Sequence, residues 1–265
     1  MKKTWYVILF LVIAFAFIGC TDSREPIDVT QFRHFTVSIP TAEEEAEQVI
    51  NSLRSVQLFV SQNIIYPPSS FRFPNTSLFN DAMRRIEAGE ILTVAEENQL
   101  REHFINDVYD ARDYQRYFNT LARAVQRADE RIDSLRRFEN AWGFYIPNVY
   151  RIFITVWGIG STATPATATI NMFSDHIMLS PNLLYIIDHE VIHIGIDERI
   201  IRRFNIPHWT MERIVDLFQI NHFGPIGRPL QQEPEYPIDI IFEQPDVLDY
   251  LPQRVEEFLR EHRQQ

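Results

Sequence analysis

One short apolar segment of the chain contains residues that could hold a metal ion. His189 and His193 are four residues apart, so on a helix they lie on one face and their imidazoles converge on a point. Glu190 lies about 100° around the same helix, which places its carboxylate beside that point. Two neutral imidazoles are good zinc ligands, and the glutamate could take a proton from a metal-bound water. The spacing therefore predicts a metal site with a general base next to it.

The residues around these three indicate that their helix is buried. Apolar side chains cover most of its circumference, namely Leu183, Leu184, Ile186, Ile187, Val191, Ile192, Ile194 and Ile196. Two histidines and a glutamate inside such a helix are costly unless each has a partner, and a metal ion supplies one.

A second pair of carboxylates follows on the next predicted helix. After a predicted reversal at 204–207, a helix runs from about His208 to Asn221 and carries Glu212 and Asp216 on one face. Their neighbours are apolar, and no lysine is nearby to pair with them. If the two helices pack together, Glu212 can reach the metal as third ligand. Asp216 can then hold a ligand histidine in the required tautomer.

The segment from His189 to Asp216 resembles the gluzincin branch of the zinc metallopeptidases. The resemblance rests on a His-Glu-Xaa-Xaa-His motif, eighteen further residues, and then Glu212 with an aspartate one turn later. It implies one Zn²⁺ held by His189, His193 and Glu212, with Glu190 as general base and Asp216 orienting His189. It also implies that the strand at about 167–173 receives a peptide substrate by β-addition.

Gluzincins also use a tyrosine or histidine to stabilise the tetrahedral intermediate, and three residues are candidates here: Tyr185, His208 and His222. The amino-terminus-binding segment Gly-Xaa-Met-Glu-Asn of the aminopeptidases is absent, which favours an endopeptidase. His176, shortly before the helix that carries His189 and His193, could line the cleft that leads to the metal. His34, His103 and His262 are expected to be exposed.

The elements that must position these residues fall into two parts. Residues 41–140 show helical periodicity, with capping boxes at Thr41/Glu44 and Thr93/Glu96 and an apolar stripe interpreted as core: Tyr114, Tyr117, Phe118, Leu121, Val125, Ile132, Leu135 and Phe138. Two β-rich runs follow, at 150–157 and 167–170. We expect an α+β fold with a helical lobe over 41–145. The resemblance adds a zincin-like domain over 146–265, with a small, mainly antiparallel sheet before the metal helices.

The N-terminus has the pattern of a secretory signal. Lys2 and Lys3 precede an apolar run from Trp5 to Ile18, which is shorter than the ~20 residues that a membrane-spanning helix needs. The run ends in Phe17-Ile18-Gly19-Cys20, which resembles the lipobox of bacterial lipoproteins. This implies a signal peptide over 1–19, membrane attachment through a lipidated Cys20, and a location in the bacterial cell envelope outside the cytoplasm. Residues 20–40 are then interpreted as a tether. The alternative is an uncleaved anchor with an incidental cysteine.

Composition excludes some classes of partner and ligand. The net charge of −11 argues against a nucleic-acid partner, because phosphate binding needs a basic face. Cys20 is the only cysteine, so any metal must be held by histidines and carboxylates.

The expected function is zinc-dependent hydrolysis of peptide bonds in a peptide or protein substrate. Two alternatives stay open. One is a non-catalytic zinc-binding lipoprotein or pseudo-enzyme that presents a cleft to a partner. The other is a structural envelope protein in which Glu212 and Asp216 form ion pairs with the two histidines of the core.

Overall fold

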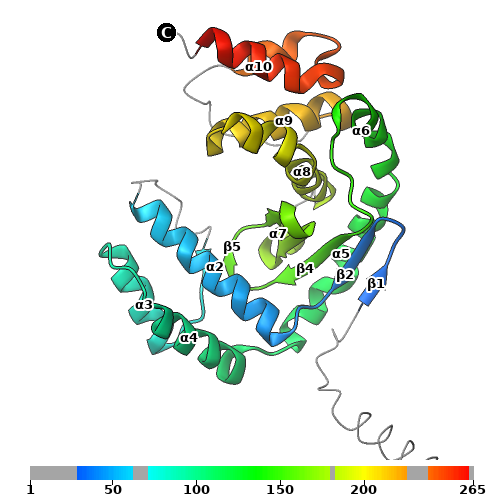
Figure 1. Ribbon diagram of the computed structural model, residues 1–265. Coiled ribbons are helices and arrows are strands. Elements are labelled where there is room, and N and C mark those ends of the chain that lie inside the picture. Colours follow the sequence, from blue (N-terminus) through cyan, green and yellow to red (C-terminus); the bar gives the residue numbers. More distant parts are fainter. Residues whose placement is uncertain (1–28, 62–70, 180–182, 226–237, 263–265) are drawn as a thin grey trace, which may run out of the picture.

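The computed structural model describes residues 29–61, 71–179, 183–225 and 238–262 (Figure 1). The predicted signal peptide and Cys20 lie outside the described residues. Within the described ranges, no helix is both long enough and apolar enough to cross a membrane.

A five-stranded mixed sheet forms the centre of the molecule. Its order is β1 (Val29–Gln31), β2 (Phe35–Ser38), β4 (Tyr150–Thr155), β7 (Thr169–Phe173) and β6 (Thr162–Thr164). Strands β2, β4 and β7 run parallel, and only the edge strands β1 and β6 are antiparallel to their neighbours. The α+β class is as expected, but the prediction of a mainly antiparallel sheet is wrong. The long helical segment between β2 and β4 is a crossover, which allows these two strands to run in the same direction.

The first strands correct the predicted tether. From residue 29 the chain belongs to the sheet, and the side chains of Phe35, Val37 and Ile39 are completely buried. His34 is buried with them, so the expectation that it is exposed is also wrong. The available signal was the alternation of the apolar Phe35, Val37 and Ile39 with the polar Thr36 and Ser38, which is typical of a strand.

Helices α2 (Ala42–Ser61), α3 (Ser77–Glu87) and α4 (Val94–His103) share a separate apolar core. Both predicted capping boxes are present. Thr41 and Glu44 exchange hydrogen bonds of 2.9 and 3.2 Å ahead of α2, and Thr93 and Glu96 do the same at α4. A two-stranded ribbon of β3 (Phe71–Arg72) and β5 (Gly158–Ile159) connects this part to the region after β4.

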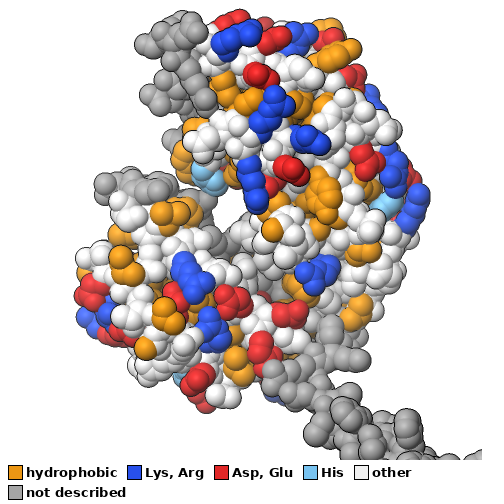
Figure 2. Space-filling model, in the orientation of Figure 1, with side chains coloured by type: hydrophobic (Ala, Val, Ile, Leu, Met, Phe, Trp, Pro, Cys, Tyr) orange, Lys and Arg blue, Asp and Glu red, His pale blue; other side chains and the backbone are white. Residues whose placement is uncertain are grey.

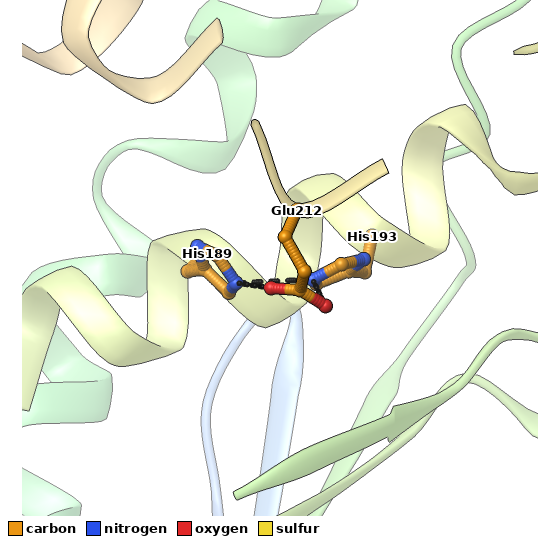
Figure 3. Close-up of side chains that lie close together, drawn as sticks. All are labelled: His189, His193 and Glu212. Carbon is orange, nitrogen blue, oxygen red and sulfur yellow. Dashed lines mark hydrogen bonds and ion pairs between the residues drawn. The ribbon is translucent and has the colours of Figure 1, made fainter. Parts of the chain in front are cut away.

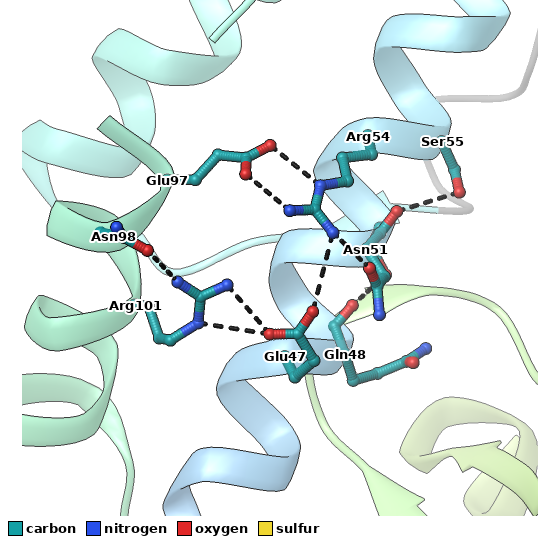
Figure 4. A network of polar contacts seen from close by, with 9 residues as sticks. Glu47, Gln48, Asn51, Arg54, Ser55, Glu97, Asn98 and Arg101 are labelled. Atoms are coloured by element: carbon teal, nitrogen blue, oxygen red, sulfur yellow. Dashed lines mark hydrogen bonds and ion pairs between the residues drawn. The ribbon is translucent and has the colours of Figure 1, made fainter. Parts of the chain in front are cut away.

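Arginines hold α2 against α4 (Figure 4). Arg54 of α2 donates to both carboxylate oxygens of Glu97, at 2.9 and 2.6 Å. In the reverse direction, Arg101 of α4 donates to Glu47 at 2.9 Å. Paired, planar contacts of this kind fix the relative orientation of the two helices.

Helices α5 (Arg112–Asp129) and α6 (Arg136–Trp142), joined by a short 3₁₀ turn (Ile132–Leu135), carry the predicted apolar stripe. All eight residues of the stripe are buried, as expected. They pack, however, in one core with the sheet and the helices that follow it, separate from the core of α2–α4. A lobe boundary at residue 145 is therefore wrong, because α5 and α6 belong to the main body.

The C-terminal half is helical. It contains α7 (Ser174–Leu179), α8 (Leu183–Ile196), α9 (His208–Phe223) and α10 (Leu251–His262), with a π-helical turn (Asp197–Arg202) and two 3₁₀ turns (Ile238–Glu243 and Val247–Tyr250) between them. Figure 1 shows α8, α9 and α10 on the opposite side of the molecule from α2–α4. Figure 2 shows a hollow in the surface between these two parts.

Candidate metal centre

The two helices predicted to carry the site are present as α8 and α9, and they pack in antiparallel orientation. Tyr185 near the start of α8 contacts Asp216 and Gln219 in the second half of α9, whereas His193 near the end of α8 meets Glu212. The chain reverses between them through Asn205, which has a φ of 50°, and Pro207, which precedes the first residue of α9. The predicted helix–reversal–helix arrangement is confirmed.

The structure brings His189, His193 and Glu212 together (Figure 3). The Nε2 atoms of the two histidines are 3.0 Å apart. Glu212 Oε2 lies 3.2 Å from His189 Nε2, and Oε1 lies 3.4 Å from His193 Nε2. One potential ligand atom of each residue lies within 4.8 Å of the others, and all three side chains are largely buried.

These spacings fit a tetrahedral ion. Zinc bonds of about 2.1 Å to nitrogen and oxygen place neighbouring ligand atoms about 3.4 Å apart at the corners of a tetrahedron. The two Nε2 atoms are 3.0 Å apart, and each lies 3.2 or 3.4 Å from a different oxygen of the Glu212 carboxylate, so these contacts are close to that edge length. Two imidazole Nε2 atoms this close also need a cation between them or a proton on one, because their lone pairs otherwise repel.

Asp216 lies behind His189, on the side away from the other ligand-type atoms. It is completely buried, and its Oδ1 is 3.2 Å from His189 Nδ1. The Tyr185 hydroxyl donates to the same oxygen at 2.6 Å, and Gln219 Nε2 donates to the carbonyl of Tyr185 at 2.8 Å. A carboxylate at Nδ1 keeps the proton on that nitrogen and leaves Nε2 free to bind a metal.

The ionisable groups of the cluster shift one another's pKa values. Burial alone would raise the pKa of Glu212, but the adjacent His189 and His193 outweigh it and hold that pKa well below its usual range. Burial opposes protonation of His189, yet Asp216 and Glu212 raise its pKa to about 9. Three carboxyl groups, including Glu190, therefore face two imidazoles.

Glu190 is buried beside the triad. Burial raises its pKa, and so does the charge of Glu212, whereas the two histidines lower it. A buried carboxyl group with a raised pKa is suited to accept and return a proton near neutral pH.

The three candidates for stabilising a tetrahedral intermediate lie in different places. The Tyr185 hydroxyl is engaged by Asp216, and His222 at the far end of α9 is hydrogen-bonded to Ser134 at 2.8 Å. His208 is partly exposed in the first turn of α9, with Nδ1 3.9 Å from Glu212 Oε1. Of the three side chains, only that of His208 is both exposed to solvent and close to a ligand-type atom of the triad. His176 is hydrogen-bonded through Nδ1 to Ser161 at 2.8 Å.

The resemblance implied that the strand at about 167–173 receives a peptide substrate, and this prediction is wrong. Residues 165–167 form a 3₁₀ turn, and β7 is paired on both sides, with β4 and with β6. A strand whose edges are both occupied cannot accept a peptide backbone. The outer strand is β6, whose three residues were too few to predict.

Asp188 is a buried residue next to the site that the sequence pattern did not single out. Burial raises the pKa of Asp188 to about 7, although Arg131, which follows the end of α5 and has its Nη1 2.7 Å away, acts to lower it. The available signal was an aspartate within an apolar helix, because a buried carboxylate needs a partner.

A scan against protein-family models found no match to this chain, and searches of curated proteins and of solved structures also found none.

Proposed function

We propose that this chain is a zinc-dependent metallopeptidase whose single ion is held by His189, His193 and Glu212. The observation that supports this most strongly is the convergence of both imidazole Nε2 atoms and the Glu212 carboxylate, whose contacts of 3.0 to 3.4 Å are close to the edge length of a zinc tetrahedron. When bound, the ion would lower the pKa of a coordinated water and polarise a substrate carbonyl.

The residues of the chain have distinct roles in this proposal. Glu190 takes a proton from the attacking water and returns it to the leaving amine, and its burial raises its affinity for that proton. Asp216 fixes the orientation of His189, and Tyr185 in turn fixes Asp216. His208 is placed to donate a hydrogen bond to the oxyanion of the intermediate. Attachment to the bacterial envelope through a lipidated Cys20 is part of the proposal and rests on the N-terminal sequence pattern alone.

The proposal is tested by zinc content and by peptide cleavage in the chain from Thr21 to Gln265, which contains every described residue. Elemental analysis should find about one zinc per chain in the wild type and in His262→Ala, a control on the distant helix α10, and none in His193→Ala. Glu190→Gln should keep the zinc and lose at least about a hundredfold in the rate of cleaving an unfolded protein.

Two results would separate the alternatives. A folded wild type that takes up no zinc when it is offered would leave an ion-paired core, and the proposal would then be wrong. Stoichiometric zinc without cleavage of any member of a broad peptide library would instead indicate a non-catalytic zinc protein.

A further inference from the structure

A pocket of about 570 Å³ lies behind the candidate metal centre, between α5, the start of α8 and the end of α9. We infer that this pocket binds a small anionic ligand, a phosphate or carboxylate group on a compact apolar body, through Arg123 and Arg127. Its volume is within the range of ordinary small-molecule sites. The inference does not depend on the proposed function, because none of the three predicted metal ligands lines the pocket.

One wall of the pocket is a row of arginines. Arg123 and Arg127 lie four residues apart on α5, so they share one face of the helix. Arg131 follows just after the end of α5, and all three arginines line the pocket. Arg131 is already paired with the buried Asp188 at 2.7 Å. The ion pairs recorded in the described ranges include none that involves Arg123 or Arg127.

This leaves a local excess of positive charge in an acidic protein. The chain as a whole has a net charge of −11, and its surface arginines otherwise commonly pair with carboxylates. Asp188 is the only acidic residue among those that the described structure places around the pocket, and Arg131 neutralises it. Two guanidinium groups one helical turn apart can hold an oxyanion between them through charge-assisted hydrogen bonds.

The other residues that line the pocket indicate the chemistry of the rest of the ligand. Ile177, Leu183 and Phe223 provide apolar surface. Gln219 is almost completely buried, and its Oε1 has no hydrogen-bond partner in the described structure. An unpaired buried acceptor is costly, so a donor at this point of the pocket would be favoured. These features fit an anion attached to a compact, mainly apolar group with one hydrogen-bond donor.

The pocket also adjoins the proposed metal ligands through a single side chain. Tyr185 lines the pocket, and its hydroxyl donates at 2.6 Å to Asp216, which lies 3.2 Å from His189 Nδ1. The two sites are therefore separate but share a wall.

Binding is tested by isothermal titration calorimetry on the chain from Thr21 with three probes. Inorganic phosphate supplies the anion alone, phenyl phosphate supplies the anion with an apolar body, and benzyl alcohol supplies the apolar body alone. We expect phenyl phosphate to bind more tightly than phosphate, and benzyl alcohol to show no saturable binding. The double variant Arg123→Gln/Arg127→Gln should weaken phenyl phosphate binding at least tenfold.

Arg116→Gln is the matched control, because Arg116 is an exposed arginine of the same helix that lies over the ring of Tyr117 and does not line the pocket. It should bind phenyl phosphate like the wild type. Equal affinity in all three proteins would place binding elsewhere, for example at the proposed metal, and would overturn the inference. Failure of the wild type to bind either phosphate probe would overturn it as well, as would benzyl alcohol binding as tightly as phenyl phosphate. Circular dichroism of each variant confirms that it is folded.

Discussion

Glu45 shows how a single buried carboxyl group ties two parts of the molecule together. It lies in the first turn of α2, and its Oε1 accepts hydrogen bonds from the Thr155 hydroxyl and from the backbone N–H of Val156 and Trp157, at 2.9, 2.9 and 3.2 Å. Burial raises the pKa of Glu45 to about 7, although these hydrogen bonds oppose the rise. The same carboxyl group in the unfolded chain has an ordinary pKa of 4.5.

This difference predicts a pH-dependent stability. Between pH 4.5 and 7 the folded state binds more protons at Glu45 than the unfolded state, so the free energy of unfolding falls as the pH rises. Glu45→Gln can accept the same hydrogen bonds and has no charge to lose. Relative to this variant, the wild type should lose about 2 kcal/mol of stability between pH 5.5 and 8. Urea unfolding at several pH values measures the difference.

The control for this prediction is Glu102→Gln, an exposed glutamate on α4. Its stability should follow that of the wild type at every pH. If the curves of Glu45→Gln and the wild type stayed parallel, Glu45 would be ionised in the fold throughout this range.

At the residue scale, sequence spacing predicted that His189, His193 and Glu212 meet, but not what surrounds them. His189, His193 and Glu212 were predictable because helical periodicity fixes which residues share a face, and the reversal before α9 is marked by Pro207. The pairing of Asp188 with Arg131 was not predictable, since it joins residues 57 positions apart in segments whose packing only the folded chain defines. The pocket beside them could not be predicted for the same reason.

At the element scale, a glycine sets how closely α8 approaches the aromatic core. A Cβ on Gly195 would lie 1.9 Å from Cζ of Phe144, a completely buried ring that packs against Trp142 and Phe218. The helix therefore approaches Phe144 at a distance that only glycine allows. Glycine destabilises a helix by about 1 kcal/mol relative to alanine. The close contact between α8 and Phe144 therefore requires a residue with a poor helix propensity.

Gly195→Ala should consequently destabilise the fold by about 1–3 kcal/mol, although alanine is the better helix former. Phe144→Leu removes the ring edge that the new methyl group would meet. In the double variant the two effects should not add, and the interaction energy of the double-mutant cycle should favour the pair by at least about 1 kcal/mol. Thermal or urea unfolding of the four proteins measures it. Additive effects would mean that α8 shifts freely away from Phe144.

The elements themselves were predictable where local chemistry marks them. The capping boxes ahead of α2 and α4 defined where these helices begin, and the stripe on α5 and α6 defined their buried face. The strands β1 and β6 were not predicted, because three residues carry too little periodicity. β2 was missed although Phe35, Val37 and Ile39 alternate with polar residues, because the segment was interpreted as a tether. Their direction in the sheet depends on long crossovers, which local sequence does not encode.

At the scale of the whole molecule, strand β2 joins the N-terminal part of the described chain to the central sheet. β2 pairs in parallel with β4 from Phe35–Tyr150 to Ser38–Phe153, and the Phe35 and Tyr150 rings stack with centroids 5.0 Å apart. Full burial of side chains such as Phe35, Val37 and Ile39 contributes about 1.5–3 kcal/mol each. Their sum is a large share of the 5–15 kcal/mol that stabilises a typical domain.

A chain that begins at Thr41 should therefore fail to unfold cooperatively, whereas a chain that begins at Thr21 should show a single sharp transition. Circular dichroism during urea unfolding distinguishes the two. The single substitution Val37→Asp in the longer chain serves as a check, since it should have a similar effect without any change of length. A stable, cooperative fold starting at Thr41 would mean that β2 is dispensable.

The arginine ion pairs that join α2 to α4 are typical of the described structure, where the side-chain cations of the ion pairs are arginine or histidine. Lysine occurs only at positions 2 and 3. A guanidinium group keeps its charge above pH 12, whereas a lysine amine loses it near 10.4. The arginine contacts should thus persist in mildly alkaline solution. Because the chain from Thr21 has no side-chain amine, succinimidyl esters would react only with its terminal amine, and a single fluorophore could be attached there without disturbing any ion pair.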